Sequence, residues 1–93
     1  MSETARVAEV TALSDRELEA RIAELEREER TVSRRRSTLH NRIDFVRAGG
    51  HASAEPSDES LEDLVAMEHE VSERRHELHT CIDELRAERS RRR

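Results

Sequence analysis

Five types of polar residue, spaced in the same way, occur twice in the chain and together suit a polar ligand. Each member of the second set follows its counterpart by 39 residues, and ten of the 19 positions in 29–47 are identical in 68–86. Internal repetition at a fixed spacing indicates one structural unit used twice, so we expect a ligand with two equivalent halves. The repeated residues are Glu29, Ser33, Arg36, His40 and Asp44, then Glu68, Ser72, Arg75, His79 and Asp83.

These residue types favour a nucleotide. Arginine forks bind phosphate oxygens and the O6/N7 edge of guanine, and their planes stack on bases. Carboxylates accept hydrogen bonds from guanine N–H groups, and serine hydroxyls suit phosphate or ribose. The set therefore fits a symmetric guanine nucleotide with two phosphates. Charged residues on the flanks of a coiled coil that pair one turn apart explain any single residue, but they do not explain five residue types kept at the same four spacings twice.

Composition excludes a large globular core. Charged residues make up 42% of the 93 residues and aromatic residues 1%, which suits an elongated helical protein with a narrow apolar stripe. The net charge of −5 argues against direct DNA binding. A lone cysteine, Cys81, and the lack of a membrane-length apolar run or a secretory pattern favour the cytoplasm and no membrane contact.

Periodicity predicts two helices joined by one connection. A capping box, Ser14 to Glu17, starts the first helix, Gly49-Gly50 ends it, and Ser57 or Asp58 is expected to cap the second. The expected organisation is a flexible arm over 1–13, helix over 14–48, connection over 49–58, helix over 59–90 and a basic tail over 91–93. The heptad seams are Leu18, Ile22, Leu25, Glu29, Val32, Arg36, Leu39, Ile43 and Val46, then Leu61, Leu64, Glu68, Val71, Arg75, Leu78, Ile82 and Leu85.

Two heptad helices with a short connection form an antiparallel coiled-coil hairpin, which makes the fold class all-α. One register brings every apolar layer together and leaves glutamate and arginine in the middle layers. On a helical wheel the repeated polar residues form a stripe beside the apolar one. In an antiparallel pair the two polar stripes then merge into one surface with approximate two-fold symmetry.

The repeated pattern resembles the signature of the RsiG family of actinobacterial anti-sigma factors. That signature is Glu, Ser, Arg, Gln and Asp at the same spacings, one copy on each helix of an antiparallel coiled coil, and the resemblance covers residues 29–83. It implies that the chain binds a dimer of cyclic di-GMP and that the chain with its bound nucleotide sequesters the sporulation sigma factor WhiG. His40 and His79 depart from the family, which has Gln at these positions, although neutral His still makes one hydrogen bond.

The resemblance also implies a role for each repeated residue. The two arginines contact guanine edges or phosphates, the two aspartates accept from guanine N–H groups, and the two serines contact phosphate. The two glutamates accept from the nucleotide or hold the arginines in place, and the two histidines add a hydrogen bond.

Other functions fit the residues less well. A zinc site needs several adjacent ligands, and His69, His76 and His79 have no second cluster beside them. Glu73-x-x-His76 is similar to a di-iron motif that needs further glutamate-bearing helices. No nucleophile–base pair or phosphate-binding glycine loop is present, so we expect no metal and no enzyme activity. The alternative function is a plain coiled-coil adaptor or dimerisation module, and a homodimer is compatible with either function.

Overall fold

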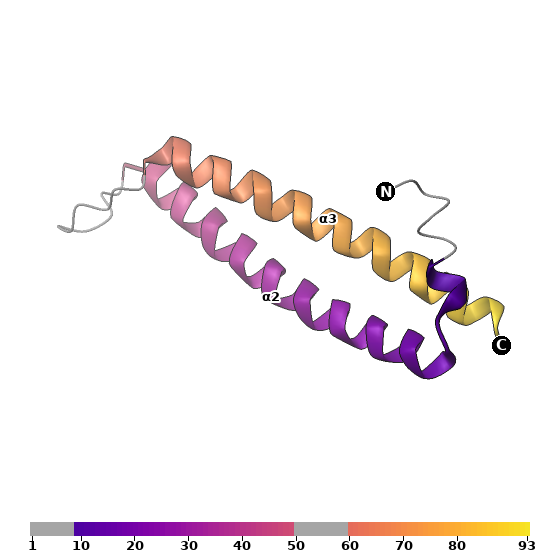
Figure 1. The fold of residues 1–93 in the computed structure, drawn as a ribbon. Helices are drawn as coiled ribbons and strands as arrows, with labels where there is room; N and C mark the ends of the chain where they lie inside the picture. Colours follow the sequence, from indigo (N-terminus) through magenta and orange to yellow (C-terminus); the bar gives the residue numbers. More distant parts are fainter. Residues whose placement is uncertain (1–8, 50–59) are drawn as a thin grey trace. The chain divides into compact units, whose positions relative to one another are not determined.

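The computed structural model describes residues 9–49 and 60–93, and their regular structure is helical throughout (Figure 1). Helix α2 spans Asp15–Arg47 and helix α3 spans Leu61–Arg91, while residues 9–12 form a single helical turn. The expected all-α two-helix hairpin is confirmed. Most of the expected arm (1–8) and connection (50–58) lies outside the described residues. Neither long helix is apolar enough to cross a membrane.

Side-chain caps fix where both helices begin. The Ser14 amide donates to Glu17 Oε1 at 2.9 Å and the Glu17 amide donates to Ser14 Oγ at 3.1 Å, which is the expected capping box. The bond from the Ser14 amide lowers the pKa of Glu17. Helix α3 has the same device one residue before its start, because the Asp63 amide donates to Ser60 Oγ at 3.1 Å. Ser60 therefore caps this helix, and the predicted caps Ser57 and Asp58 lie outside the described residues.

A glycine ends α2. Gly49 has a φ of 87°, a left-handed conformation that side-chain-bearing residues rarely adopt. Its amide donates to the Val46 carbonyl at 3.0 Å, so one of the last carbonyls of the helix is satisfied there. The expected helix stop is therefore present in the structure.

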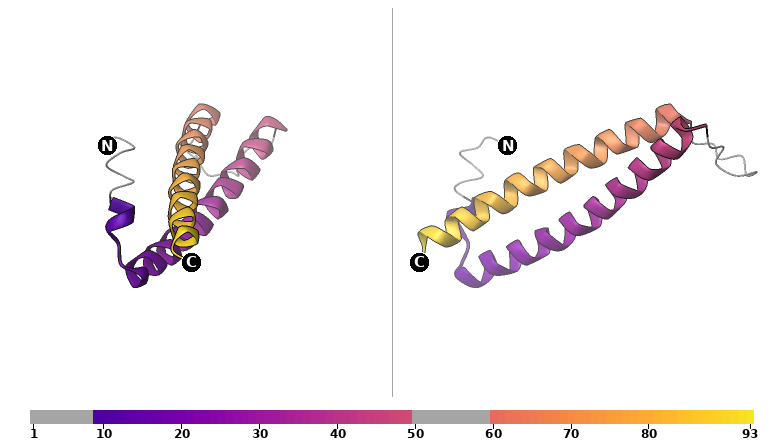
Figure 2. Two further views of the ribbon diagram at one scale, coloured as in Figure 1. Left: turned by 90° about the vertical axis from the view of Figure 1, so that its right-hand side faces the viewer. Right: turned by 180° about the vertical axis from the view of Figure 1, so that it is seen from behind.

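The chain divides into two compact units, each built from a stretch of α2 and a stretch of α3. One unit contains Arg30–His76, and the other joins the residues up to Glu29 with Glu77–Arg93. We call them the inner unit and the terminal unit. Figure 2 shows the two helices from two further directions. In each unit the paired stretches run antiparallel, as their contacts below show.

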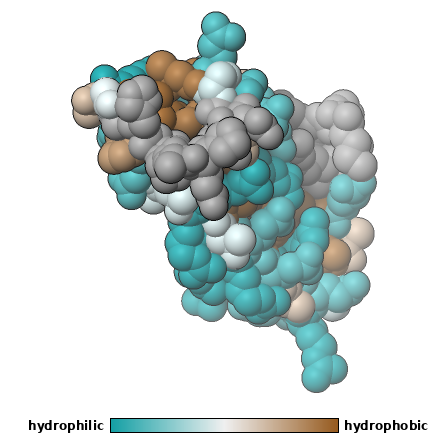
Figure 3. Space-filling model, turned by 90° about the vertical axis from the view of Figure 1, so that its left-hand side faces the viewer, coloured by the Kyte–Doolittle hydropathy of each residue, from teal (hydrophilic) through white to brown (hydrophobic). Residues whose placement is uncertain are grey.

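The inner unit has a small apolar core. Leu39, Ile43 and Leu64 are buried together, and all three are predicted seam residues. On the face of the molecule shown in Figure 3 most of the coloured residues are hydrophilic, as expected when only one narrow stripe per helix is apolar. Partly buried hydrophobic residues surround this core: Val46, Leu61, Val65, Met67 and Val71.

The terminal unit combines an apolar seam with ion pairs along its flank. Every buried hydrophobic residue in it is a predicted seam residue, namely Leu18, Ile22, Leu25, Leu78, Ile82 and Leu85. Cross-helix ion pairs link Arg86 to Glu26, Arg89 to Glu19 at 3.4 Å, and Arg92 to Asp15 at 3.0 Å. Partners that rise along α3 fall along α2, which establishes the antiparallel arrangement within this unit.

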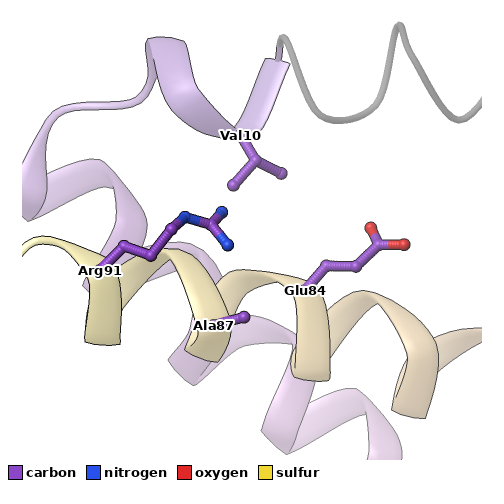
Figure 4. Close-up of a pocket in the computed structure, with 4 residues that line it drawn as sticks. All are labelled: Val10, Glu84, Ala87 and Arg91. Carbon is purple, nitrogen blue, oxygen red and sulfur yellow. The ribbon is translucent and has the colours of Figure 1, made fainter.

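The sequence analysis did not foresee a buried carboxylate near the end of α3. Glu88 is only 7% exposed, because Arg91 and Arg92 both bond to its carboxylate at 2.7 Å. These two arginines hold the pKa of Glu88 below its usual value. The Arg92 guanidinium also donates to the carbonyls of Val10 and Thr11. The N-terminal turn is thereby held on α3, where Val10 lies over Ala87 between Glu84 and Arg91 (Figure 4).

We predict that the inner core sets the stability of its unit. Leu64 is 2% exposed, so Leu64→Ala removes buried apolar atoms and leaves a cavity, which is expected to lower the free energy of unfolding by about 2–5 kcal/mol. Phe45→Ala is the control, because Phe45 is 54% exposed and its loss is expected to change that free energy by less than about 0.5 kcal/mol. Urea denaturation followed by circular dichroism measures both. Equal losses in the two variants would contradict the assigned core.

Candidate functional site

The repeated polar residues lie on both helices beside the apolar seam. Those in the inner unit are partly buried, except for exposed Asp44, and they are Ser33, Arg36, His40, Glu68, Ser72 and Arg75. Glu29, His79 and Asp83 belong to the terminal unit. Amphipathic periodicity explains this position, because residues spaced by three and four remain on one side of a helix.

Four repeated residues of the inner unit form one continuous hydrogen-bond network. Arg36 Nε donates to Ser72 Oγ at 3.0 Å, and Ser72 Oγ donates to Glu68 Oε1 at 2.6 Å. His40 Nε2 lies 2.9 Å from the same carboxylate oxygen. Because an ionised carboxylate only accepts, His40 is the donor and carries its proton on Nε2. The network therefore bonds α2 to α3 at two points.

The equivalent contacts recur with the helices exchanged. Within the inner unit Arg75 Nε donates to Ser33 Oγ at 3.0 Å, just as Arg36 does to Ser72. Within the terminal unit His79 Nε2 lies 3.0 Å from Glu29 Oε1, just as His40 does from Glu68. Each contact thus joins a residue of one copy to the other copy. The sequence repeat is matched by a repeat of the interactions themselves.

Arg36 is held by only one of its nitrogens. Both its hydrogen bond to Ser72 and its 3.7 Å approach to Glu68 use Nε. The two terminal nitrogens bond to none of the described residues, and the side chain is 37% exposed. The guanidinium is therefore oriented by the protein while its outer edge faces solvent. Such an edge can bind a phosphate or the O6/N7 edge of a guanine bidentately.

The two aspartates are not part of this network. Asp44 and Asp83 are exposed, and neither side chain bonds to any residue within 9–49 or 60–93. Asp44 lies on α2 and Asp83 on α3, at equivalent positions of the two motifs. The structure thus brings together the glutamates, serines, arginines and histidines and leaves the aspartates as exposed acceptors.

The electrostatics of the network centre on Glu68. Its pKa is lowered by the hydrogen bond from Ser72, then by that from His40, and by the positive charge of Arg36, while partial burial opposes these effects. Glu68 is therefore ionised at neutral pH and acts as an acceptor for its neighbours. Among the described residues no group of three or more His, Cys, Asp or Glu side chains is placed to hold a metal ion.

The sequence analysis named the ten repeated residues but did not predict which of them contact one another across the helices. The wheel placed each stripe on its own helix, and it did not indicate that every arginine would bond to the serine of the other copy. The antiparallel arrangement could have indicated these contacts, because the residues of one helix meet those of the other in reverse order. For the first four residues of each motif the partner is found by reading those four of the other copy in reverse, which pairs Glu29 with His79 and Ser33 with Arg75.

Comparison with known proteins identifies the family. A family model described as RsiG-like matches residues 4–66. The chain belongs to the RsiG-like family. The matched segment contains the first polar motif and ends just before Glu68, the first residue of the second. Neither a curated protein nor a solved structure matches the chain. Membership of the RsiG-like family indicates an anti-sigma-factor-type regulator whose partner is a sigma factor.

We predict that the Glu68 network makes the free energy of unfolding depend on pH in the acidic range. Because the pKa of Glu68 is lower in the folded chain, its stabilising effect is complete above the ordinary value of 4.5 and is lost as the pH falls through the lowered folded value. Glu68→Gln keeps an acceptor but does not titrate. Between about pH 5 and pH 3 the free energy of unfolding is expected to fall less steeply in this variant than in the wild type.

Urea titrations at each pH measure this difference in slope. The matched control is Glu62→Gln, which changes an exposed carboxylate on the same helix. Glu17 and Glu88 titrate in both proteins, so only the difference between variants reports on Glu68. If wild type and Glu68→Gln lose stability in parallel, the network does not stabilise the ionised carboxylate.

Proposed function

We propose that this RsiG-like protein is an anti-sigma factor that binds cyclic di-GMP through its two polar motifs and then sequesters a WhiG-type sigma factor. Transcription from promoters of that sigma factor is thereby inhibited, with a role in sporulation. The ligand-binding residues are Glu29, Ser33, Arg36, His40, Asp44, Glu68, Ser72, Arg75, His79 and Asp83. Family membership supports the sigma-factor partner, and the repeated contacts support a ligand with two equivalent halves.

The orientation of Arg36 is the observation that carries the nucleotide proposal. Its Nε is anchored by Ser72, so little side-chain freedom remains to be lost when its outer edge binds a ligand. Arg75 is anchored through Nε by Ser33 in the same way. Two arginines held equivalently within one unit match the two equivalent guanines or phosphates of a cyclic dinucleotide.

The other residues complete the proposed site. Exposed Asp44 and Asp83 accept from guanine N1–H and N2–H groups, for which a carboxylate has two suitably spaced oxygens. Ser33 and Ser72 present hydroxyls to phosphate. Glu68 accepts from Ser72 and His40, and in this arrangement it holds the donors of the site in place. A dimer of cyclic di-GMP supplies enough guanines for both copies of the motif.

Nucleotide and sigma factor act together in this proposal. The nucleotide contacts both proteins, so each binding event strengthens the other by the same factor. The protein inhibits by occupying the sigma factor, without catalysis and without contacting DNA or a membrane. It works in the cytoplasm, where the sigma factor meets RNA polymerase. A plain coiled-coil adaptor is the alternative function, because the polar contacts between the helices would also fix their register.

We predict that Arg36→Ala combined with Arg75→Ala abolishes binding of cyclic di-GMP while helicity is retained. Isothermal titration calorimetry measures binding, with GMP and cyclic di-AMP as selectivity controls, and circular dichroism measures helicity. The matched control is Arg35→Ala with Arg74→Ala, which removes the same charges from exposed positions that also repeat. It is expected to bind within about threefold of the wild type, because these residues lie away from the polar stripe.

Titration in the presence of a WhiG-type sigma factor completes the test, since the nucleotide and the partner bind cooperatively in this proposal. Selective heat from cyclic di-GMP in wild type and control, but not in the Arg36/Arg75 variant, supports the nucleotide site. The proposal fails if the wild type binds no cyclic di-GMP either alone or with the sigma factor. A change in melting or oligomeric state in the Arg36/Arg75 variant, without any nucleotide binding to lose, would identify the adaptor function.

A further inference from the structure

The two copies of the repeat agree on the polar stripe and differ on the outer side of the helices. Within 29–47 and 68–86 the motif residues are identical, whereas several exposed positions on the outer side have changed in chemical class. Arg30 corresponds to His69, Arg34 to Glu73 and Phe45 to Glu84, and the two threonines 31 and 38 correspond to Glu70 and Glu77. A two-fold symmetric ligand explains why the motif residues are the same in both copies. It does not explain why the exposed outer residues differ.

The outer side of α2 in the inner unit is basic. Between Glu29 and Asp44 this helix has no carboxylate, although the chain contains 22 acidic residues. On a helical wheel with Glu29 at zero, these positions lie between about 100° and 220°, next to the polar stripe, which reaches about 60°. All of them are exposed. We call this surface the outer face of α2 and define it by Arg30, Arg34, Thr38, Asn41, Arg42 and Phe45.

Two charges of this face, those of Arg30 and Arg34, are not paired with a carboxylate within the described part of the chain. Arg30 forms no ion pair there, and Arg34 donates only to the hydroxyl of Thr31, at 3.4 Å. By contrast, the arginines that cross between the helices in the terminal unit are paired with carboxylates, as Arg86 is with Glu26. Two arginines one turn apart, neither of them paired with a carboxylate, form a surface that attracts an anionic partner.

The face also holds the only aromatic residue of the chain. Phe45 is 54% exposed, whereas the apolar residues of the seam beside it, Leu39 and Ile43, are buried. Aromatic residues and arginine are the types most enriched among the residues that dominate protein–protein binding energy. An exposed phenylalanine beside arginines suits a protein surface better than the backbone of a duplex, whose contacts are made mainly by charged and polar groups.

The corresponding surface of α3 has the opposite charge. In the inner unit its exposed residues include Glu62, Asp63, Glu70 and Glu73. A polyanion approaching the unit from this side would be repelled, and the net charge of the whole chain is −5. The charge difference between the two helices therefore directs an acidic partner to one side of the unit.

We propose that the outer face of α2 docks an acidic surface of the sigma factor, with Phe45 inserted between apolar side chains of that partner. This inference rests on the proposed function and extends it by naming the helix face and the chemistry of the partner surface. Because the face continues from the polar stripe, one partner can cover the nucleotide and the α2 side together. Because the nucleotide is symmetric, it does not determine on which helix the sigma factor lies. The different charges of α2 and α3 determine this orientation.

A second copy of the chain is a less suitable occupant. The basic face of one copy would meet the acidic α3 surface of the next, which is a head-to-tail contact between two different surfaces. Such contacts close into rings only at particular rotations and otherwise continue into filaments. A sigma factor that binds one hairpin instead gives a complex of fixed size.

The test compares complexes of a WhiG-type sigma factor with three variants of the full chain in the presence of cyclic di-GMP. Arg30→Gln with Arg34→Gln removes two charges of the face, and Phe45→Ala removes its aromatic residue. Each is expected to weaken the sigma complex by about tenfold, mainly through faster dissociation for Phe45→Ala. The control, Glu70→Gln with Glu73→Gln, removes the same number of charges from α3 and is expected to bind at least as well as the wild type.

Calorimetry with cyclic di-GMP alone separates this inference from the proposed function. All three variants are expected to bind the nucleotide within about threefold of the wild type, because none changes a motif residue. If the wild type binds neither the nucleotide nor the sigma factor, the proposed function itself fails. If the wild type binds both and the Arg30/Arg34 variant holds the sigma factor equally well, only the docking face is wrong.

Two further outcomes would also overturn the docking face. If the face binds a second copy, light scattering would give a larger molar mass for the free wild-type chain than for the Arg30/Arg34 variant. Fluorescence anisotropy with a duplex DNA would show binding that is lost in that variant if the face binds nucleic acid. A sigma complex whose salt dependence is smaller in the Arg30/Arg34 variant than in the wild type supports the electrostatic contact.

Discussion

The interaction on which the inner unit depends is the pairing of charged residues that the helix seam places close to the apolar core. Arg36 and Glu68 occupy seam positions, where a charge without partners would oppose helix association. Ser72 and His40 satisfy both groups through a chain of hydrogen bonds from one helix to the other. The same bonds that make the charges tolerable also orient them. Stability of the helix pair and preorganisation of the site therefore have one physical origin.

The sequence was sufficient to predict the fold. Every buried hydrophobic residue lies on a predicted seam, because alternating steps of three and four keep one side of a helix facing its partner. The capping box at Ser14 was also predictable, since Ser followed three residues later by Glu before an apolar run is the signature of that cap. The start of α3 was not: several residues before it are good caps, and only the hydrogen bonds of Ser60 distinguish them.

Periodicity could not provide the partners of individual polar atoms. It placed Arg36 and Ser72 on neighbouring surfaces, but which nitrogen bonds to which oxygen depends on side-chain conformation. Burial of Glu88 was missed for a related reason. A glutamate near a helix end is normally solvated, and here two arginines one turn later cover it on both oxygens. Pattern analysis treats charges as solvated unless they lie on the apolar stripe, so a pair formed at its edge is overlooked.

The contacts of Arg92 have a consequence for the order in which the chain folds. They join residues separated by 77 to 82 positions, close to the greatest separation that this chain allows. The inner unit is built from residues closer in sequence, so its loop closes with a smaller entropic cost. In the terminal unit the buried residues Leu18, Ile22 and Leu25 meet their partners only when a much longer loop closes. The inner unit is therefore expected to form before the terminal unit, and the contacts of Arg92 close the longest loop.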